Sequence, residues 1–137
     1  MQIIYMVSIF IRELWVCTIY IFIDPVTSVK LGKDNQCYLA SVSSSTVQLM
    51  DFPSGSALNT FKGHFHSKYR IESCFSADES IVYSGSEDSK IYAWDLVSGD
   101  QVSLLAGHSL PITSLAHHSK KSILLTSSTD STIRVWE

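Results

Sequence analysis

Two sets of four side chains in this sequence carry groups that could exchange protons or hold one another by hydrogen bonds. In each set an aspartate lies four residues after a hydroxyl residue and six before a tryptophan, and a histidine lies further upstream. The first set is His64, Ser84, Asp88 and Trp94, and the second is His108, Thr126, Asp130 and Trp136. Because serine, histidine and aspartate form the triad of many hydrolases, one chemistry to weigh is acyl transfer at Ser84 with His64 as the base.

Two features favour a structural network over a catalytic triad. The set recurs in tandem with threonine in place of serine, and neither copy has the glycine-flanked turn that exposes a hydrolase serine. A neutral imidazole can donate to a carboxylate and accept from a hydroxyl, while an indole N–H donates to the same hydroxyl oxygen. All polar groups would then be paired, so we predict a buried network in both sets, with about 0.5–1.5 kcal/mol from each bond.

The elements that position these residues repeat along the chain. Offsets of 44 and then 42 residues align SSSTVQLMD (43–51), EDSKIYAWD (87–95) and TDSTIRVWE (129–137). Short runs rich in Val, Ile, Tyr and Thr, separated by Ser, Asp and Gly, are typical of strands joined by tight turns. A period of this length gives four strands per unit, which predicts an all-β protein built of propeller blades at 24–61, 62–105 and 106–137.

The first of these units lacks the polar residues of the other two. Ala40, Ser44 and Met50 stand where the network needs a hydroxyl, a carboxylate and an indole. We therefore expect packing alone to hold this unit.

Four dipeptides give the repeat a family resemblance. Gly63-His64 and Gly107-His108 match the GH signature of the WD-repeat β-propellers, Trp94-Asp95 matches their WD signature, and Trp136-Glu137 is a common variant. The resemblance implies that the two sets of four are the buried network of that family. Since such propellers usually close with seven blades, we expect a partial propeller of about two and a half to three blades. We also expect the isolated chain to be marginally stable or self-associating, because a short array leaves apolar blade faces in water.

A narrower resemblance is to the C-terminal blades of the MAP-kinase organiser family of WD-repeat scaffolds. It covers residues 24–137 and includes a connection after Gly63-His64 that is two residues longer than the one after Gly107-His108. This resemblance implies a cytoplasmic and nuclear scaffold that assembles kinase-cascade components and is also found in spliceosomal assemblies.

Residues 1–23 differ abruptly from the rest of the chain. They are almost wholly apolar, interrupted by Arg12 and Glu13, and we expect them to lie outside the repeat fold. They are long enough for a membrane span but carry two charges at the centre, and they lack the basic start and cleavage site of a signal peptide. A membrane anchor and a segment that is not native to the fold, through a gene-model artefact, both stay open.

Charge and cysteine content exclude several classes of function. The net charge of −3 comes from interleaved acids and bases, so we expect neither direct nucleic-acid binding nor attraction to a membrane surface. Three cysteines, Cys17, Cys37 and Cys74, share no metal-binding spacing and favour a reducing compartment. His66 and His117-His118 have no cysteine or carboxylate partners at ligand spacing, so we predict no metal and no cofactor.

The remaining candidates for function are loop residues near the GH dipeptides. They form an aromatic and basic group suited to anchoring a protein partner, although solvated loops without a partner would look similar. We predict a non-catalytic scaffold, with a membrane-tethered WD-repeat protein, a hydrolase and a truncated, non-functional fragment as the alternatives. The predicted partner-binding residues are Phe65, His66, Lys68, Tyr69, Arg70 and Glu87 in the second unit, and Ser109, Leu110, Pro111 and Thr129 in the third.

Overall fold

Strands make up all the regular structure in the described part of the chain. The computed structural model describes the backbone of residues 8–11, 14–17 and 22–137, and the side chains of residues 22–137. Within these ranges there is no helix that is long and apolar enough to cross a bilayer. The strands are β1 (Ser8–Ile11), β2 (Leu14–Cys17), β3 (Val26–Leu31), β4 (Cys37–Val42), β5 (Thr46–Asp51), β6 (Ala57–Lys62), β7 (Ser73–Phe75), β8 (Ile81–Ser84), β9 (Lys90–Asp95), β10 (Gln101–Ala106), β11 (Ile112–His117), β12 (Leu124–Ser128) and β13 (Ile133–Trp136).

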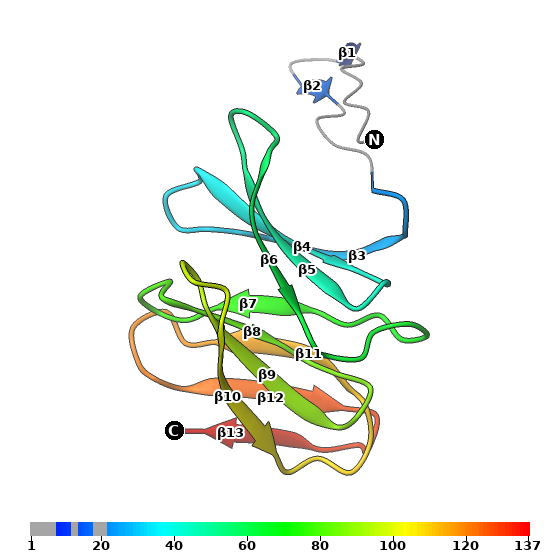
Figure 1. Ribbon diagram of the computed structural model, residues 1–137, viewed down its shortest axis with the longest axis vertical. Coiled ribbons are helices and arrows are strands. Elements are labelled where there is room, and N and C mark those ends of the chain that lie inside the picture. The colour runs from blue at the N-terminus through cyan, green and yellow to red at the C-terminus, as the bar shows by residue number, and fades with distance from the viewer. Residues whose placement is uncertain (1–7, 12–13, 18–21) are drawn as a thin grey trace.

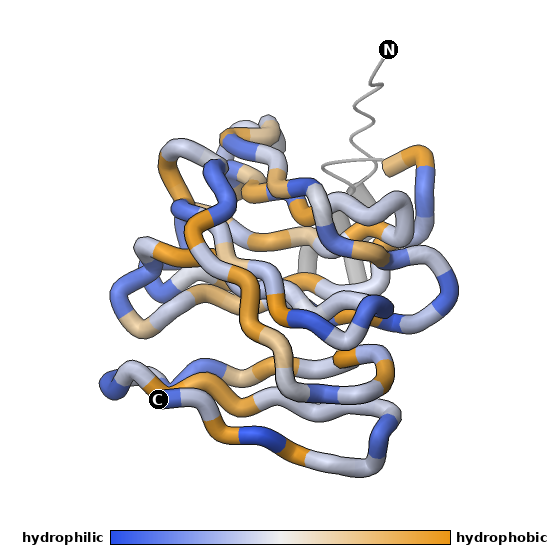
Figure 2. Tube along the Cα trace, turned by 60° about the horizontal axis from the view of Figure 1, so that its bottom comes forward, coloured by the Kyte–Doolittle hydropathy of each residue, from blue (hydrophilic) through white to orange (hydrophobic). Residues whose placement is uncertain are grey.

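Three successive antiparallel meanders form the body of the molecule. The first sheet has the order β3-β4-β5-β6, the second β7-β8-β9-β10 and the third β11-β12-β13. Figure 1 shows these sheets following one another along the long axis, and Figure 2 shows hydrophobic residues along the strands with hydrophilic ones in many connecting turns. The chain is therefore all-β, with repeating sheets stacked like the blades of a partial propeller.

Apolar side chains from neighbouring sheets form the two main core clusters. The first cluster joins the first and second sheets, and the second cluster joins the second and third sheets. Because each sheet buries one face against the next, the core is a series of interfaces rather than a single centre. The first cluster contains Leu39, Val47, Leu49, Phe61, Phe75, Val82, Tyr92 and Trp94; the second contains Cys74, Ile91, Ile112, Leu115 and Leu124.

The first sheet has apolar residues where the other two carry the polar set. Met50, which aligns with the two tryptophans, is fully buried beside Tyr38 and Ala40, with Phe22 packed against them. Among the strands that the structure describes, β1 and β2 pair with each other alone, in a two-stranded sheet separate from the three meanders. The two alternatives for residues 1–23, a membrane anchor and a segment that is not native to the fold, fall mostly outside the described residues.

A serine holds the same strained backbone position in all three sheets. Ser45, Ser89 and Ser131, in the turns between the second and third strands of each sheet, have φ of 58°, 68° and 66°. Left-handed backbone disfavours most side chains, while asparagine tolerates it better than serine does.

We therefore expect Ser131→Asn to raise the free energy of unfolding by about 0.5 kcal/mol. Urea denaturation followed by circular dichroism measures the change. Ser119→Asn is the matched control, since Ser119 is exposed and is not among the residues with positive φ. An equal gain in both variants would contradict the assignment to backbone strain.

Candidate functional site

At one end of the sheets, the long connections between sheets contact the tight turns between the second and third strands of each sheet. The β6–β7 connection bonds to the β4–β5 turn through Ser45 N–H to His66 O (3.1 Å). The same connection bonds to the β8–β9 turn through Glu87 N–H to Phe65 O (2.9 Å). In the third sheet, Thr129 N–H donates to Pro111 O (3.0 Å). Both predicted sets of four begin at this end.

The third sheet brings His108, Thr126, Asp130 and Trp136 into one hydrogen-bonded chain. His108 Nδ1 lies 2.8 Å from Asp130 Oδ2, and His108 Nε2 lies 2.9 Å from Thr126 Oγ1. Trp136 Nε1 donates to the same Thr126 oxygen at 2.9 Å. Since a carboxylate only accepts, Nδ1–H is the donor to Asp130, and Nε2 accepts from the Thr126 hydroxyl.

The carboxylate of Asp130 is held ionised by its neighbours. The Thr132 hydroxyl donates to Asp130, and together with the His108 ring and the N–H groups of Ser109 and Thr132 it holds the pKa of this carboxyl well below its usual range. The His108 and Asp130 side chains are only 0% and 7% exposed. The arrangement therefore pairs every polar group with little contact to water.

Asp130, His108 and Thr126 are hydrogen-bonded in the same sequence as a catalytic triad. Unlike the nucleophile of a triad, however, the Thr126 hydroxyl cannot reach a substrate. Thr126 is 1% exposed, and its oxygen already accepts the Trp136 N–H. A nucleophile must instead present a free lone pair at the surface. The geometry is that of a structural network.

The second sheet differs from the prediction, because His64, Ser84, Asp88 and Trp94 do not form the same network. Neither ring nitrogen of His64 has a hydrogen-bond partner among the described residues. Ser84 Oγ donates to Gly85 O (3.0 Å), and Trp94 Nε1 donates to Lys62 O (3.1 Å). The His64 ring instead packs edge-on against Trp94, with 5.5 Å between ring centroids. The hydrolase alternative has no support here, since Ser84 and His64 do not contact through a hydrogen bond.

Two local features explain the difference. Tyr92 OH donates to Asp88 Oδ2 at 2.9 Å and so takes the place of the histidine, whereas the aligned residue in the third sheet is Arg134. Gly63 has a φ of 113°, while Gly107 is not among the glycines with positive φ. Because the backbone before the two histidines differs, the side chain of His64 points in a different direction from that of His108. Tyr92 is visible in the sequence, but nothing in the motif predicts that its hydroxyl bonds to Asp88.

Burial of His64 makes the protein sensitive to acid. Desolvation, and then the charge of His66, lower the pKa of His64 from 6.5 to about 4, with Asp88 opposing in part. Between these pH values the unfolded chain binds a proton that the folded chain does not, so acid favours unfolding.

Through His64, the wild-type chain should lose roughly 2 kcal/mol of its free energy of unfolding between pH 7 and pH 5. We expect His64→Leu to abolish this part of the loss. Urea denaturation at the two pH values measures the loss. His118→Leu, at an exposed position, should leave the loss unchanged. If His64→Leu kept the full wild-type loss, the acid sensitivity would have another source.

His66 is not a surface residue, and its prediction as a partner-binding residue is wrong. It is 0% exposed, and its Nε2 lies 3.2 Å from Thr27 Oγ1 and 3.4 Å from the Ile71 N–H that donates to it. The longer β6–β7 connection has enough length to fold this side chain back between the first and second sheets. The buried His66 ring therefore stabilises the β6–β7 connection through its contacts with Thr27 and Ile71.

The remaining residues of the β6–β7 connection form an exposed surface whose backbone is fixed by hydrogen bonds to Glu87. Phe65 is 64% exposed and Tyr69 43% exposed. Beneath them the Glu87 carboxylate accepts the N–H groups of Ser67 (2.6 Å), Lys68 (2.6 Å) and Tyr69 (3.1 Å). We call Phe65, Ser67, Lys68, Tyr69 and Arg70 the loop surface.

Hydrogen bonds of Glu87 and Arg70 hold the backbone of the loop surface in place. Partial burial acts to raise the pKa of Glu87, but the N–H donors of residues 67–69 outweigh it and lower the pKa. Arg70 Nε donates to Thr27 O at 2.9 Å. A groove of about 570 Å³ runs beside these residues, lined by Pro25, Val26, Thr27, Ser43, Ser67, Lys68, Tyr69 and Arg70.

The candidates in the third sheet lie at the equivalent turn. Leu110 is exposed, and its carbonyl accepts Ser128 Oγ at 2.9 Å. Pro111 is half-buried with its carbonyl bonded to Thr129, while Ser109 and Thr129 are exposed. This turn has no aromatic side chain comparable with Phe65 or Tyr69.

The described residues hold no group of three or more histidine, cysteine or acidic side chains that could bind a metal. Cys37 and Cys74 are free thiols, and burial raises the pKa of Cys74 to about 12. This thiol is therefore protonated at neutral pH and is a poor nucleophile.

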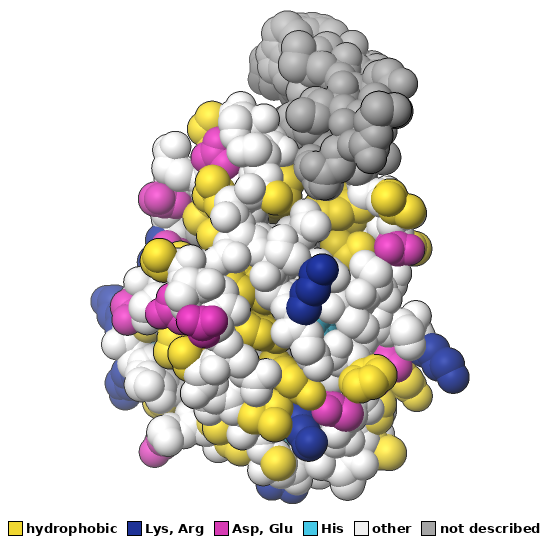
Figure 3. All heavy atoms as spheres, in the orientation of Figure 1, with side chains coloured by type: hydrophobic (Ala, Val, Ile, Leu, Met, Phe, Trp, Pro, Cys, Tyr) yellow, Lys and Arg dark blue, Asp and Glu magenta, His cyan; other side chains and the backbone are white. Residues whose placement is uncertain are grey.

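On the face drawn in Figure 3, acidic and basic side chains are scattered without a run of one sign.

The stacked four-strand and three-strand meanders define a blade-type repeat protein, and comparison with known proteins gives its family. The model for "WD domain, G-beta repeat" (WD40) matches residues 55–95 and 99–137. The chain belongs to the WD40-repeat family. The predicted WD-repeat resemblance and the all-β propeller fold are thereby confirmed.

Individual relatives agree with this assignment. Over 113 residues (82% of this chain) the sequence is 44% identical to the WD repeat domain-containing protein 83 homolog of Dictyostelium discoideum. Over 103 residues (75% of this chain) it is 38% identical to human WD repeat domain-containing protein 83. The chain spans only about a third of these relatives, 35% and 33% of their lengths.

A solved structure of U3-55K superposes with a TM-score of 0.75 at 18% identity. The match covers 84% of this chain and 36% of that one. At this identity the likeness concerns the fold alone.

Proposed function

We propose that this chain is a non-catalytic scaffold module that binds protein partners through the loop surface. One observation carries the proposal: two large aromatic side chains, Phe65 and Tyr69, are exposed on a loop that is fixed from below by Glu87 and His66. Aromatic anchors on a rigid loop bind well because little conformational entropy is lost on association.

The chemistry of the polar sets supports a role without catalysis. Thr126 is buried and hydrogen-bonded to both His108 and Trp136, and among the residues that the structure describes no base is bonded to Ser84. Where aspartate, histidine and a hydroxyl do line up, they hold the third sheet together. Binding is the activity that the exposed residues support.

The identity of the partners is part of the proposal. The resemblance to the MAP-kinase organiser family points to kinase-cascade components or spliceosomal proteins, in the cytoplasm and the nucleus. Lys68 and Arg70 beside the aromatic pair would favour an acidic region on such a partner.

Paired substitutions test the proposal. Phe65→Ser with Tyr69→Ser should lower recovery of partner proteins at least tenfold in a quantitative pull-down with the tagged chain. The matched control is Leu58→Ser with Val97→Ser, which removes two exposed apolar side chains away from the loop surface. Equal recovery with both pairs, at matched melting temperatures, would contradict the proposal.

A further inference from the structure

Ser67 lies among the hydrogen bonds that fix the backbone of the loop surface. Its side chain is exposed, and its hydroxyl donates to Glu87 Oε2 at 3.3 Å, which is longer than usual for a hydroxyl donor. Its N–H donates to the other oxygen, Glu87 Oε1, which also accepts the N–H groups of Lys68 and Tyr69. Successive backbone N–H groups that converge in this way form a binding site for one anionic group, and Glu87 occupies it. Reaction at the Ser67 hydroxyl therefore costs little hydrogen-bond energy.

Two cations lie close to Ser67 in the sequence and on the same loop. Lys68 follows it directly, and Arg70 lies three residues on, with its Nε bonded to Thr27 O. Neither cation forms an ion pair with an acidic side chain among residues 22–137. The terminal nitrogens of a guanidinium carry further N–H donors. The surroundings of Ser67 can therefore bind an added anionic group.

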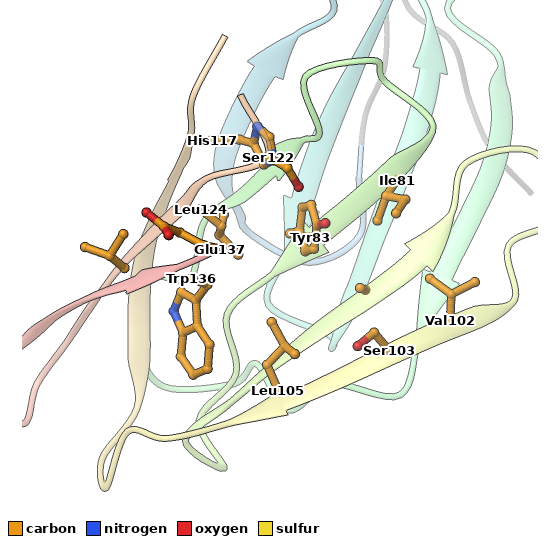
Figure 4. Close-up of a pocket in the computed structure, with 12 residues that line it drawn as sticks. Ile81, Tyr83, Val102, Ser103, Leu105, His117, Ser122, Leu124, Trp136 and Glu137 are labelled. Carbon is orange, nitrogen blue, oxygen red and sulfur yellow. The ribbon is translucent and has the colours of Figure 1, made fainter. Parts of the chain in front are cut away.

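The groove beside the loop surface has a matching charge. Ser67, Lys68 and Arg70 are among its walls, and none of the described residues that line it is acidic. A cavity of about 480 Å³ between the second and third sheets differs in this respect (Figure 4). Its described lining is mainly apolar, as at Leu105, and includes the carboxylate of Glu137 but no lysine or arginine. Of these two cavities, the groove is the one that suits a phosphate.

We propose that Ser67 is a phosphorylation site and that its phosphate turns off partner binding by the loop surface. This inference rests on the function proposed above for that surface. A protein kinase supplies the group from a nucleoside triphosphate. A bond forms between the γ-phosphorus and Ser67 Oγ, the bond to the departing nucleoside diphosphate breaks, and the hydroxyl proton passes to a base of the kinase.

A phosphate at this position disturbs the contacts beneath the loop surface. It carries about two negative charges at pH 7 and lies next to the Glu87 carboxylate, so the two groups repel each other. Lys68 and Arg70 bind the phosphate, whereas Glu87 forms no ion pair among the described residues. The carboxylate therefore leaves the three N–H groups, and the backbone under Tyr69 is no longer fixed.

Phosphoserine incorporated at position 67 of the full chain tests this structural step without any partner. Burial acts to raise the pKa of Glu87, and the three N–H donors lower it by more. Loss of these donors and the added negative charge both act to raise the pKa. We therefore expect a higher pKa of Glu87 in NMR titrations of its side-chain carbonyl carbon, with shifted amide signals of residues 67–69.

Phosphoserine at position 98 is the matched control. Ser98 is also exposed and also donates its N–H to a carboxylate, that of Asp95 (2.8 Å). No lysine, arginine or histidine lies between Trp94 and Val102. This variant should leave the Glu87 pKa and the loop amide signals unchanged.

Two measurements in cells test the modification and its effect. Trypsin releases residues 63–68, GHFHSK, in which Ser67 is the only hydroxyl residue, so mass spectrometry of this peptide locates the phosphate. We expect phosphorylated peptide in chain isolated from cells treated with phosphatase inhibitors. Partner recovery in the pull-down should be about tenfold lower with phosphoserine than with serine at position 67.

Peptide 63–68 recovered from such cells without any phosphate would overturn the proposal. An unchanged Glu87 pKa, with unchanged amide signals, would do the same. So would equal recovery with serine and phosphoserine when Phe65→Ser with Tyr69→Ser lowers it. If that pair has no effect on recovery, the function proposed for the loop surface fails, and the phosphate on Ser67 is still decided by mass spectrometry and titration.

Discussion

Trp94→Ala is expected to lower the free energy of unfolding by about 3–5 kcal/mol, the largest loss among the substitutions considered for this chain. The indole is 1% exposed; it contacts Phe61 across the interface of the first two sheets, His64 of the β6–β7 connection, and Tyr92 of its own strand. Its removal leaves a cavity that the two sheets could fill only by shifting toward one another, which would disturb their other contacts.

Urea denaturation followed by circular dichroism measures the effect of this substitution. Trp94→Phe is the matched variant, since it keeps a ring in the interface and loses the N–H bond to Lys62 O. We expect it to cost about 1–2 kcal/mol. A loss below 1 kcal/mol for Trp94→Ala would show that the two sheets are not held together at this residue.

Thr126→Val should cost about 2–4 kcal/mol, because it preserves shape and removes the oxygen at the centre of the polar network. His108 Nε2 loses its donor and Trp136 Nε1 loses its acceptor. The buried His108 and the partly buried Trp136 would then both lack their partners, which is more costly than the loss of a single bond.

Ser84→Ala provides the contrast that tests the difference between the sheets. Ser84 occupies the aligned position, but among the described residues its hydroxyl bonds to the carbonyl of the next residue alone. We expect a loss below about 1 kcal/mol, as for one ordinary side-chain bond. Comparable losses for Thr126→Val and Ser84→Ala would mean that the predicted network exists in both sheets, contrary to the geometry described above.

Much of the architecture could be predicted from the chain, because repeated turns and tryptophans mark the units directly. Asp51 and Asp95, for example, each accept N–H groups of the turn that follows them, as expected for short aspartate turns. Such local chemistry is visible in a few neighbouring residues.

The candidate site was harder to predict because its details depend on contacts between distant segments. Tyr92 competes for Asp88 through an ordinary hydrogen bond, and nothing in the motif distinguishes this residue from other strand tyrosines. His66 turns inward because Thr27 and Ile71 offer it polar partners, one of them 39 residues away. Which loop residues face solvent was therefore decided by packing between sheets.

Site-specific photo-crosslinking tests the central claim, that the loop surface contacts a protein partner, most directly. p-Benzoyl-phenylalanine in place of Tyr69 should yield a discrete crosslinked adduct in cells after irradiation, identified by mass spectrometry. The same group in place of Val97, which is 88% exposed outside the loop surface, should yield none. Adducts of equal yield at both positions, or at position 97 alone, would contradict the account.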